Sequence, residues 1–209
     1  MTGSGKIFIG TIGVLAIFLI ATRLRGQDEY DVEFGPIEIL PGCRDVVLLG
    51  DSLTTSAHYR SHLANLLGPC STVMAMGFPN KQTGYINKQV DQAIATDPTD
   101  VVVLAGVNDL ASGKSAEQVI ANLELIYTKL ANEGIRVIGV HLTPWDMHNK
   151  GKNLQEATDR VNEWITYVAP IHAVVNTFNV TGQGQDGLHL TKLGQKQLAE
   201  AVYLDGFDK

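Results

Sequence analysis

Residues 45–53 read DVVLLGDSL: an apolar run ends at Gly50, and Asp51 and Ser52 follow directly. A run of valine and leucine without polar interruptions is typical of a strand that is buried on both faces, as in a parallel sheet covered by helices. The polar pair after it has two explanations. Asp and Ser are ordinary caps of a following helix, or Ser52 is a nucleophile held at the end of a sheet.

The alternation of strand-like and helix-like segments continues from residue 43 to the end of the chain. Strands are predicted at 46–50, 72–77, 100–106, 136–142 and 172–177. Helices are predicted at about 53–67, 83–96, 115–133, 153–168 and 191–203. This pattern predicts a flavodoxin-like three-layer α/β/α sandwich with a parallel sheet. Because crossovers between parallel strands are right-handed, the expected strand order is 2-1-3-4-5.

The composition of the 209 residues indicates one folded domain rather than a disordered chain. Hydrophobic residues make up 44% and charged residues 18%, which is enough apolar material for a packed core. The net charge is −6, and no basic stripe interrupts this acidic balance. Nucleic acid is therefore not an expected partner.

An uncharged, apolar segment spans residues 7–21, with Lys6 before it and two arginines shortly after it. It is slightly short for a membrane span, which needs about 20 residues, and long for the apolar part of a signal peptide. We expect residues 1–25 to form a hydrophobic helix that anchors the chain in a membrane through residues 7–22. A cleaved signal peptide and a buried core helix are the alternatives.

Residues 26–42 contain an acidic cluster and two prolines, as linkers often do, so residues 43–209 are expected to form the main domain. Positive charge flanks both ends of the apolar segment, and the positive-inside rule therefore hardly discriminates between orientations. The short N-terminal tail favours a domain on the extracytoplasmic or periplasmic side, or a secreted domain if the segment is cleaved.

The two cysteines, Cys43 and Cys70, each precede a predicted strand. If those strands are adjacent and parallel, both thiols lie at the same end of the sheet, where a disulfide is sterically possible. Such a disulfide would fit an oxidising compartment. Two unpaired, half-buried thiols are the alternative.

Three polar motifs follow strands of the predicted sheet: GDSL at 50–53, GVND at 106–109 and DGLH at 186–189. In open α/β sheets, ligands bind beyond the carboxyl ends of the strands, where the strand order reverses. The three motifs are therefore expected to meet in one crevice.

The first and last of these motifs suit nucleophilic catalysis. A serine hydroxyl is a weak nucleophile until a base takes its proton. Asp186 and His189 lie three residues apart in a predicted loop, so the carboxylate can bind one ring nitrogen and leave the other to face Ser52. Each signal also has an ordinary explanation: a helix cap for Ser52, and a surface acid–histidine pair for the other two.

The middle motif places Asn108 and Asp109 at the end of the third predicted strand. A side-chain amide there can donate to an oxyanion without changing its charge, although Asn and Asp are also common turn residues. Asp109 is expected to support the turn rather than to take part in chemistry.

Together these motifs resemble the SGNH, or GDSL-type, esterase and lipase superfamily over about residues 44–204. Three of the family's four sequence blocks are matched, at 50–53, 106–109 and 186–194. The resemblance implies Ser52 as nucleophile, His189 as general base and Asp186 as its partner. It also implies that Asn108 and the Ser52 N–H contribute to the oxyanion hole, and that no metal or other cofactor takes part.

The second block departs from the family pattern, in which a glycine N–H completes the oxyanion hole. Residues 76–84 read MGFPNKQTG, and loop length aligns Asn80 with that glycine. A backbone N–H serves whatever its side chain, and Asn tolerates left-handed φ; Gly77 and Gly84 are the alternatives. Either the loop is rebuilt or this donor is weakened, and losing one donor typically costs about 10²–10³ in turnover.

Five further residues need an interpretation. Trp145 and Tyr85 are candidates to line the substrate pocket, and Trp145 could equally be a hydrophobic plug in its loop. His141 lies in a predicted core strand and is expected to be structural. His58 and His62 lie four residues apart on the first helix, but no third ligand is apparent, so a solvated face is expected rather than a metal site.

The combined expectation is a serine esterase that hydrolyses an ester through an acyl-enzyme on Ser52. O-acetyl esters on a glycan and lipid or other acyl esters are the leading substrates. An acyltransferase, in which an alcohol replaces water, would use the same site. A membrane-anchored binding or structural protein without activity is a further alternative, favoured by the irregular second block and opposed by the intact Ser52, Asp186 and His189.

Overall fold

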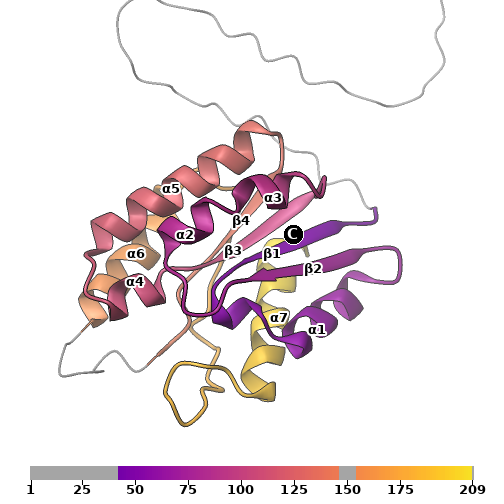
Figure 1. The fold of residues 1–209 in the computed structure, drawn as a ribbon. Helices are drawn as coiled ribbons and strands as arrows, with labels where there is room; N and C mark the ends of the chain where they lie inside the picture. The colour runs from indigo at the N-terminus through magenta and orange to yellow at the C-terminus, as the bar shows by residue number, and fades with distance from the viewer. Residues whose placement is uncertain (1–41, 146–153, 209) are drawn as a thin grey trace, which may run out of the picture. The chain divides into compact units, whose positions relative to one another are not determined.

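The computed structural model describes residues 42–145 and 154–208, which form an α/β sandwich around a parallel sheet (Figure 1). The strands are β1 (Asp45–Gly50), β2 (Thr72–Gly77), β3 (Asp100–Leu104), β4 (Arg136–Val140) and β5 (Ala173–Val175). Their order is β2-β1-β3-β4-β5, and every neighbouring pair is parallel. The predicted sheet and its strand order are therefore confirmed.

The position of each strand in the sheet explains its sequence. β1, β3 and β4 lie in the middle, and nearly all of their residues are buried. The edge strands β2 and β5 are only partly covered. The uninterrupted runs of Val and Leu thus belong to the strands that helices cover on both faces.

Helices cover both faces of the sheet (Figure 1). They are η1 (Ser52–Thr54), α1 (Ala57–Leu67), α2 (Thr83–Asn87), α3 (Val90–Ile94), α4 (Val107–Ala111), α5 (Ala116–Asn132), α6 (Gln155–Tyr167) and α7 (Lys192–Gly206). α1 and α7 pack against each other on one face, and α2 to α6 lie on the other. This arrangement leaves the carboxyl ends of the strands to the loops that carry the polar motifs.

Two helical segments differ from the prediction. The helix predicted at 83–96 is divided into α2 and α3, because the N–H groups of Lys88 and Gln89 bond three residues back and interrupt the α-helical ladder. The GVND motif is the start of a short helix, α4, rather than only a turn. Gly106 precedes it with a φ of 133°, and a Cβ there would lie 2.9 Å from Val119, so this entry to α4 requires glycine.

The predicted disulfide between Cys43 and Cys70 is present, with a Cα–Cα distance of 5.1 Å. The two cysteines precede β1 and β2, whose first residues, Asp45 and Thr72, are paired in the sheet. The bond therefore links the amino ends of two neighbouring strands.

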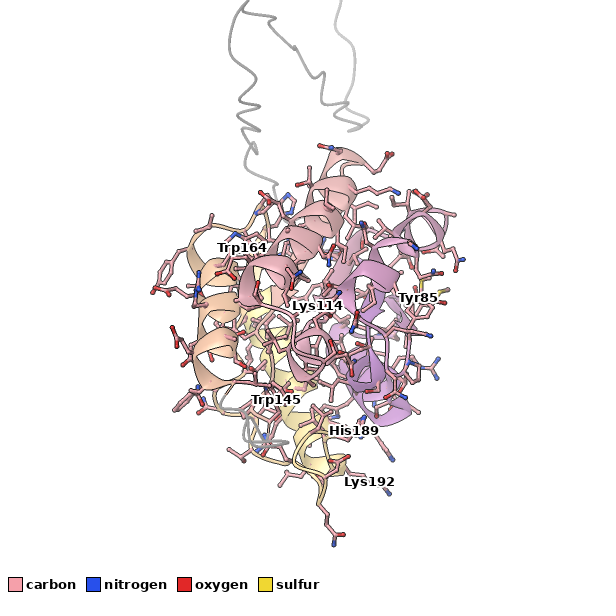
Figure 2. The ribbon with its side chains drawn as sticks, turned by 60° about the vertical axis from the view of Figure 1, so that its left-hand side comes forward. Tyr85, Lys114, Trp145, Trp164, His189 and Lys192 are labelled. Carbon is pink, nitrogen blue, oxygen red and sulfur yellow. A yellow bond between two sulfur atoms is a disulfide. The ribbon has the colours of Figure 1, made fainter. Side chains whose placement is uncertain are left out.

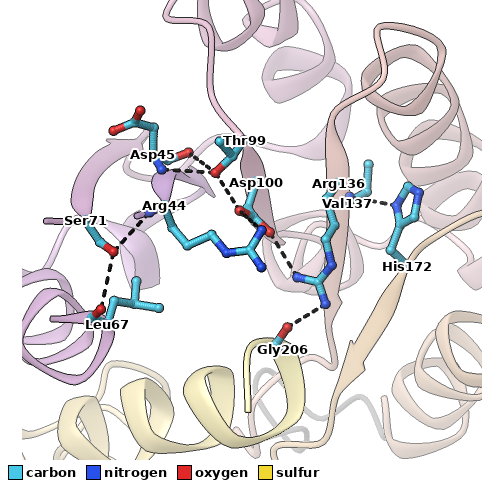
Figure 3. Close-up of polar contacts among 10 residues, drawn as sticks. All are labelled: Arg44, Asp45, Leu67, Ser71, Thr99, Asp100, Arg136, Val137, His172 and Gly206. Atoms are coloured by element: carbon cyan, nitrogen blue, oxygen red, sulfur yellow. Dashed lines mark hydrogen bonds and ion pairs between the residues drawn. The ribbon is translucent and has the colours of Figure 1, made fainter. Parts of the chain in front are cut away.

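A buried ion pair joins the amino edge of the sheet to the last helix (Figure 3). Asp100, at the start of β3, accepts from Arg136 Nη1 at 2.9 Å, and Arg136 Nη2 donates to the Gly206 carbonyl at 2.6 Å. Arg44, just before β1, lies 3.6 Å from the same carboxylate. Both ends of the described domain thus lie at this amino edge, opposite the edge at which Gly50 ends β1.

The membrane anchor and hydrophobic helix expected at residues 1–25, and nearly all of the linker expected at 26–42, lie outside the described residues. Within the part of the chain that the structure describes, no helix is both long and apolar enough to cross a membrane. The membrane anchor therefore stays a prediction.

Candidate active site

Ser52 lies just beyond the carboxyl end of β1, at the edge of the sheet. The strand ends at Gly50, and the fully buried Asp51 caps η1 by accepting the Leu53 N–H at 3.0 Å. Ser52 is the first residue of η1 and is half-buried. Both explanations of the Asp-Ser pair are thus partly realised, since Asp51 is the cap and Ser52 is left facing the motif loops.

Ser52, His189 and Asp186 form one continuous chain of polar contacts. Ser52 Oγ lies 2.8 Å from His189 Nε2, and His189 Nδ1 lies 2.6 Å from Asp186 Oδ2. The other carboxylate oxygen of Asp186 accepts the N–H groups of Leu188 and His189 at 3.1 and 2.9 Å. The loop after β5 therefore presents the imidazole and its carboxylate to the serine as one unit.

The contacts of Asp186 favour its ionised form. The hydrogen bond from His189, followed by the two backbone N–H groups, lowers the pKa of Asp186 to about 2. The side chains of His189 and Asp186 are 49% and 53% exposed, so the imidazole end of the site is open to solvent. An ionised Asp186 holds the proton of the ring on Nδ1 and leaves Nε2 as an acceptor toward Ser52.

Asn108 lies in the first turn of α4, directly beside this serine loop. Its Nδ2 lies 3.2 Å from both Asp51 Oδ2 and the Lys81 carbonyl. Both distances are at the long end of the hydrogen-bond range. The amide is thus held between the first and second motif loops by two weak bonds.

Asp51 is a site residue that the sequence interpretation did not single out. Burial raises the pKa of its carboxyl from 3.8 to about 6, against the opposing hydrogen bond from Leu53 and the proximity of His189. Its two oxygens orient η1 and Asn108 separately. Its position between a buried strand and Ser52, where a carboxylate has no access to water, could have identified Asp51 as a site residue from the sequence.

The loop after β2 supplies the second block. Asn80 has a φ of 59°, a left-handed conformation that Asn tolerates, and is exposed. Gly77 ends β2 opposite Gly50, and a Cβ there would lie 2.6 Å from Thr55 Cγ2 and 3.0 Å from the Asp51 carbonyl. Gly77 therefore serves the close approach of this loop to the serine turn.

Asp109, on α4, contacts the start of α2, where the loop after β2 ends. Asp109 is fully buried and accepts the backbone N–H and the hydroxyl of Thr83, both at 2.8 Å, as well as Lys114 Nζ at 3.1 Å. These contacts fix the start of α2, in which Gly84 lies. Asp109 thus supports the loop that carries Asn80, and none of its contacts is to Ser52 or to the His189 ring.

The two aromatic candidates lie in different settings (Figure 2). The Trp145 side chain is buried, with 7% of the residue exposed, and its Nε1 donates to Thr158 Oγ1 at 3.3 Å. Tyr85 is 39% exposed, with Lys81 Nζ 4.9 Å from its ring centre and Phe78 packed edge-on against it. Trp145 thus fits the hydrophobic plug, whereas Tyr85 braces the second-block loop at the surface.

Three other histidines of the described residues, His141, His58 and His62, lie outside this chain of contacts. His141 follows β4, and its Nε2 lies 2.8 Å from Thr166 Oγ1 on α6, in keeping with a structural role. Partial burial lowers its pKa. His58 and His62 lie on α1, on the side that faces α7.

Comparison with proteins of known structure supports the fold. A lipolytic protein of the G-D-S-L family from Veillonella parvula superposes with a TM-score of 0.65 at 18% identity, over 79% of this chain and 98% of its own. A lipase/acylhydrolase from Enterococcus faecalis gives 0.62 at 20% identity, over 76% and 93%. A psychrotrophic esterase from Pseudoalteromonas gives 0.60 at 16% identity, over 77% and 95%. No curated protein sequence matches the chain significantly.

The sequence itself matches the GDSL-like lipase/acylhydrolase family over residues 48–197, which spans all three polar motifs. This match covers most of the chain, and the fold similarity agrees with it. The chain belongs to the GDSL-like lipase/acylhydrolase family and is a serine hydrolase of the ester-hydrolysing kind.

Proposed function

We propose that this chain hydrolyses a carboxylic ester through an acyl-enzyme formed on Ser52. The observation that carries the proposal is the unbroken contact from Ser52 Oγ through the His189 ring to Asp186. Stability does not require a serine, an imidazole and an ionised carboxylate in this arrangement at an open edge of the sheet. Activation of a serine nucleophile by a histidine base uses this arrangement.

In the proposed reaction, His189 Nε2 takes the hydroxyl proton while Ser52 Oγ attacks the carbonyl carbon of the ester. Asp186 stabilises the imidazolium that forms, because it is ionised and accepts from Nδ1. His189 then gives the proton to the departing alcohol, which leaves an acyl group on Ser52. Water, activated by the same imidazole, releases the acid.

The negative oxygen of the tetrahedral intermediate needs donors that are already in position. The proposed donors are the N–H groups of Ser52 and Asn80 and the side-chain amide of Asn108. Asn108 Nδ2 lies 3.2 Å from the Lys81 carbonyl, a neutral acceptor that an anionic oxygen would replace with a stronger bond. Asp51 keeps the other amide proton and so holds the orientation.

A short acyl group, such as the acetyl of an O-acetylated glycan, is our preferred substrate over a long-chain lipid ester. The support is the open setting of His189 and the burial of Trp145, which removes a candidate wall from an acyl pocket. The related structures carry the printed names lipase/acylhydrolase and esterase, which include both substrate classes.

The test is hydrolysis of p-nitrophenyl esters of increasing chain length by the wild-type chain and by Ser52→Ala. We expect turnover of the acetyl ester to fall at least about 10³-fold in the variant, and the wild type to prefer acetyl over octanoyl. A fluorophosphonate probe should label Ser52 alone. Equal turnover by both proteins would refute the acyl-enzyme on Ser52.

We further propose that the domain works in an oxidising, extracytoplasmic compartment. The disulfide between Cys43 and Cys70 supports this, because such bonds persist mainly outside reducing cytosol. Alkylation of intact cells with a thiol reagent, followed by mass spectrometry, should find both cysteines unmodified. Quantitative alkylation of both would place the domain in a reducing compartment.

A further inference from the structure

A small polar groove lies between α1 and α7. Its volume is about 210 Å³. The lining residues are His58, Ser61, His62, Asn65, Lys192 and Lys196. The lining thus contains two lysines, two histidines and no acid, on a chain whose net charge is −6.

The cationic and imidazole groups of the groove are only partly satisfied by the protein. Lys196 Nζ and His62 Nε2 each lie 3.6 Å from a carboxylate oxygen of Glu200, which is not among the lining residues. His62 Nε2 is shielded from solvent and makes no hydrogen bond within the described residues. One carboxylate against two lysines leaves the groove with a surplus of positive charge.

One lining residue of the groove follows the loop that carries His189. Lys192 is the first residue of α7, three positions after His189, so their Cα atoms are at most about 11 Å apart. Figure 2 shows His189 and Lys192 at the same end of the molecule. Ser56, the cap of α1, donates to Gln195 Oε1 at 2.6 Å and fixes the two helix starts together. The helix starts that line the groove are therefore held together a short distance along the chain from His189.

We propose that this groove, here named the α1–α7 groove, binds an anionic group, phosphate or carboxylate, carried by the ester substrate. The inference rests on the proposed esterase function and specifies the substrate class of that site. Lys192 and Lys196 attract the anion and donate hydrogen bonds to its oxygens. Binding the anion beside the scissile ester lowers KM for charged esters and leaves neutral esters unaffected.

The experiment compares two matched pairs of esters. The first pair is acetylglycerol phosphate and acetylglycerol, in which the anion lies on the alcohol side. The second is monoethyl glutarate and ethyl pentanoate, in which it lies on the acyl side. Acid release is measured for the full chain, for Lys192→Gln, for Lys196→Gln and for Lys88→Gln, an exposed lysine on the opposite face of the sheet.

We expect the wild type to prefer the anionic member of at least one pair, and the side of the preference identifies where the anion lies. Each groove variant should reduce that preference about fivefold through KM, as expected for losing one exposed ion pair. Lys88→Gln should leave it unchanged, and 0.5 M salt should weaken it in the wild type.

The groove would not be an anion site if the wild type showed no preference for the anionic ester in either pair. The same would follow if Lys88→Gln reduced that preference as much as the groove variants do. That failure is distinguishable from failure of the esterase proposal, because the neutral esters report Ser52-dependent turnover without the groove. If neutral turnover survived Ser52→Ala, the proposed function itself would be wrong.

Discussion

Asp51 is buried beside Ser52 although burial of a carboxylate is unfavourable. It accepts one hydrogen bond from the serine turn and one from Asn108, and so connects the nucleophile's turn to a proposed oxyanion donor. The fold thus tolerates a costly group because it orients two parts of the site at once. This interpretation predicts that replacing Asp51 raises the stability of the fold and lowers its activity.

Asp51→Asn should stabilise the fold at neutral pH and lower turnover. The folded pKa of about 6 exceeds the unfolded value of 3.8, so the contribution of Asp51 to wild-type stability is full below pH 3.8 and is lost as the pH rises to about 6. About two pKa units correspond to roughly 3 kcal/mol in the free energy of unfolding. Urea unfolding should show that the free energy of unfolding of the variant, relative to that of the wild type, is larger at pH 7 than at pH 4. A difference between the two proteins that does not change with pH would contradict the prediction.

Asp186→Asn should lower kcat by about 10³–10⁴-fold with little change in KM, because an amide no longer fixes the productive tautomer of His189. The pKa of Asp186 of about 2 means that the wild-type carboxylate stays ionised above pH 3. A wild-type activity loss between pH 4 and 7 must therefore come from another group. Steady-state kinetics with Gln185→Ala, an exposed neighbour, is the control; an Asp186→Asn enzyme within tenfold of wild type would exclude the proposed role.

At the scale of elements, the loop between β2 and α2 decides how well the oxyanion hole is formed. Phe78 and Lys81 in this loop pack against Tyr85 of α2, and Asp109 holds its far end through Thr83. Its near end closes on the serine turn at Gly77. The loop is therefore fixed at both ends, with Asn80 exposed between them.

Gly77→Ala should reduce kcat and stability together, whereas Gly84→Ala should leave both nearly unchanged. A Cβ at residue 77 would lie 2.6 Å from Thr55 Cγ2, whereas a Cβ at residue 84 would lie 3.8 Å from Asn122 Nδ2, an ordinary van der Waals contact. Both substitutions keep the backbone N–H, so the pair separates packing from donation. We expect a loss of about 1–3 kcal/mol for Gly77→Ala in thermal unfolding; similar losses in both variants would refute the packing argument.

At the scale of the whole molecule, the disulfide and the proposed site lie at opposite edges of the sheet. The bond closes a loop across 27 positions, which corresponds to about 3–4 kcal/mol in the free energy of unfolding. Cys43→Ser with Cys70→Ser should therefore lower the melting temperature but retain acetyl-ester turnover at 25 °C. Loss of activity in the folded double variant would show that the two edges are coupled.

The sequence predicted the parts of the molecule that depend on periodicity and topology. Buried runs such as 45–50 predict central strands, and parallel strands bring their carboxyl ends to one edge, so the meeting of Ser52 with His189 followed. Loop contacts depend on backbone angles that no periodic pattern encodes. For this reason the approach of the Lys81 carbonyl to Asn108 was beyond prediction, and the sequence left Trp145 open between a pocket wall and a hydrophobic plug, of which its burial fits the plug.

The ion pair between Asp100 and Arg136 contacts Arg44 near one end of the domain and Gly206 near the other. Either end can therefore serve as a tether to a bead, a fused partner or an electrode while the serine still faces bulk solution. The proximity of the ends also suits circular permutation: a short peptide can join them, and new termini can be opened in a surface loop such as the one between α5 and β4.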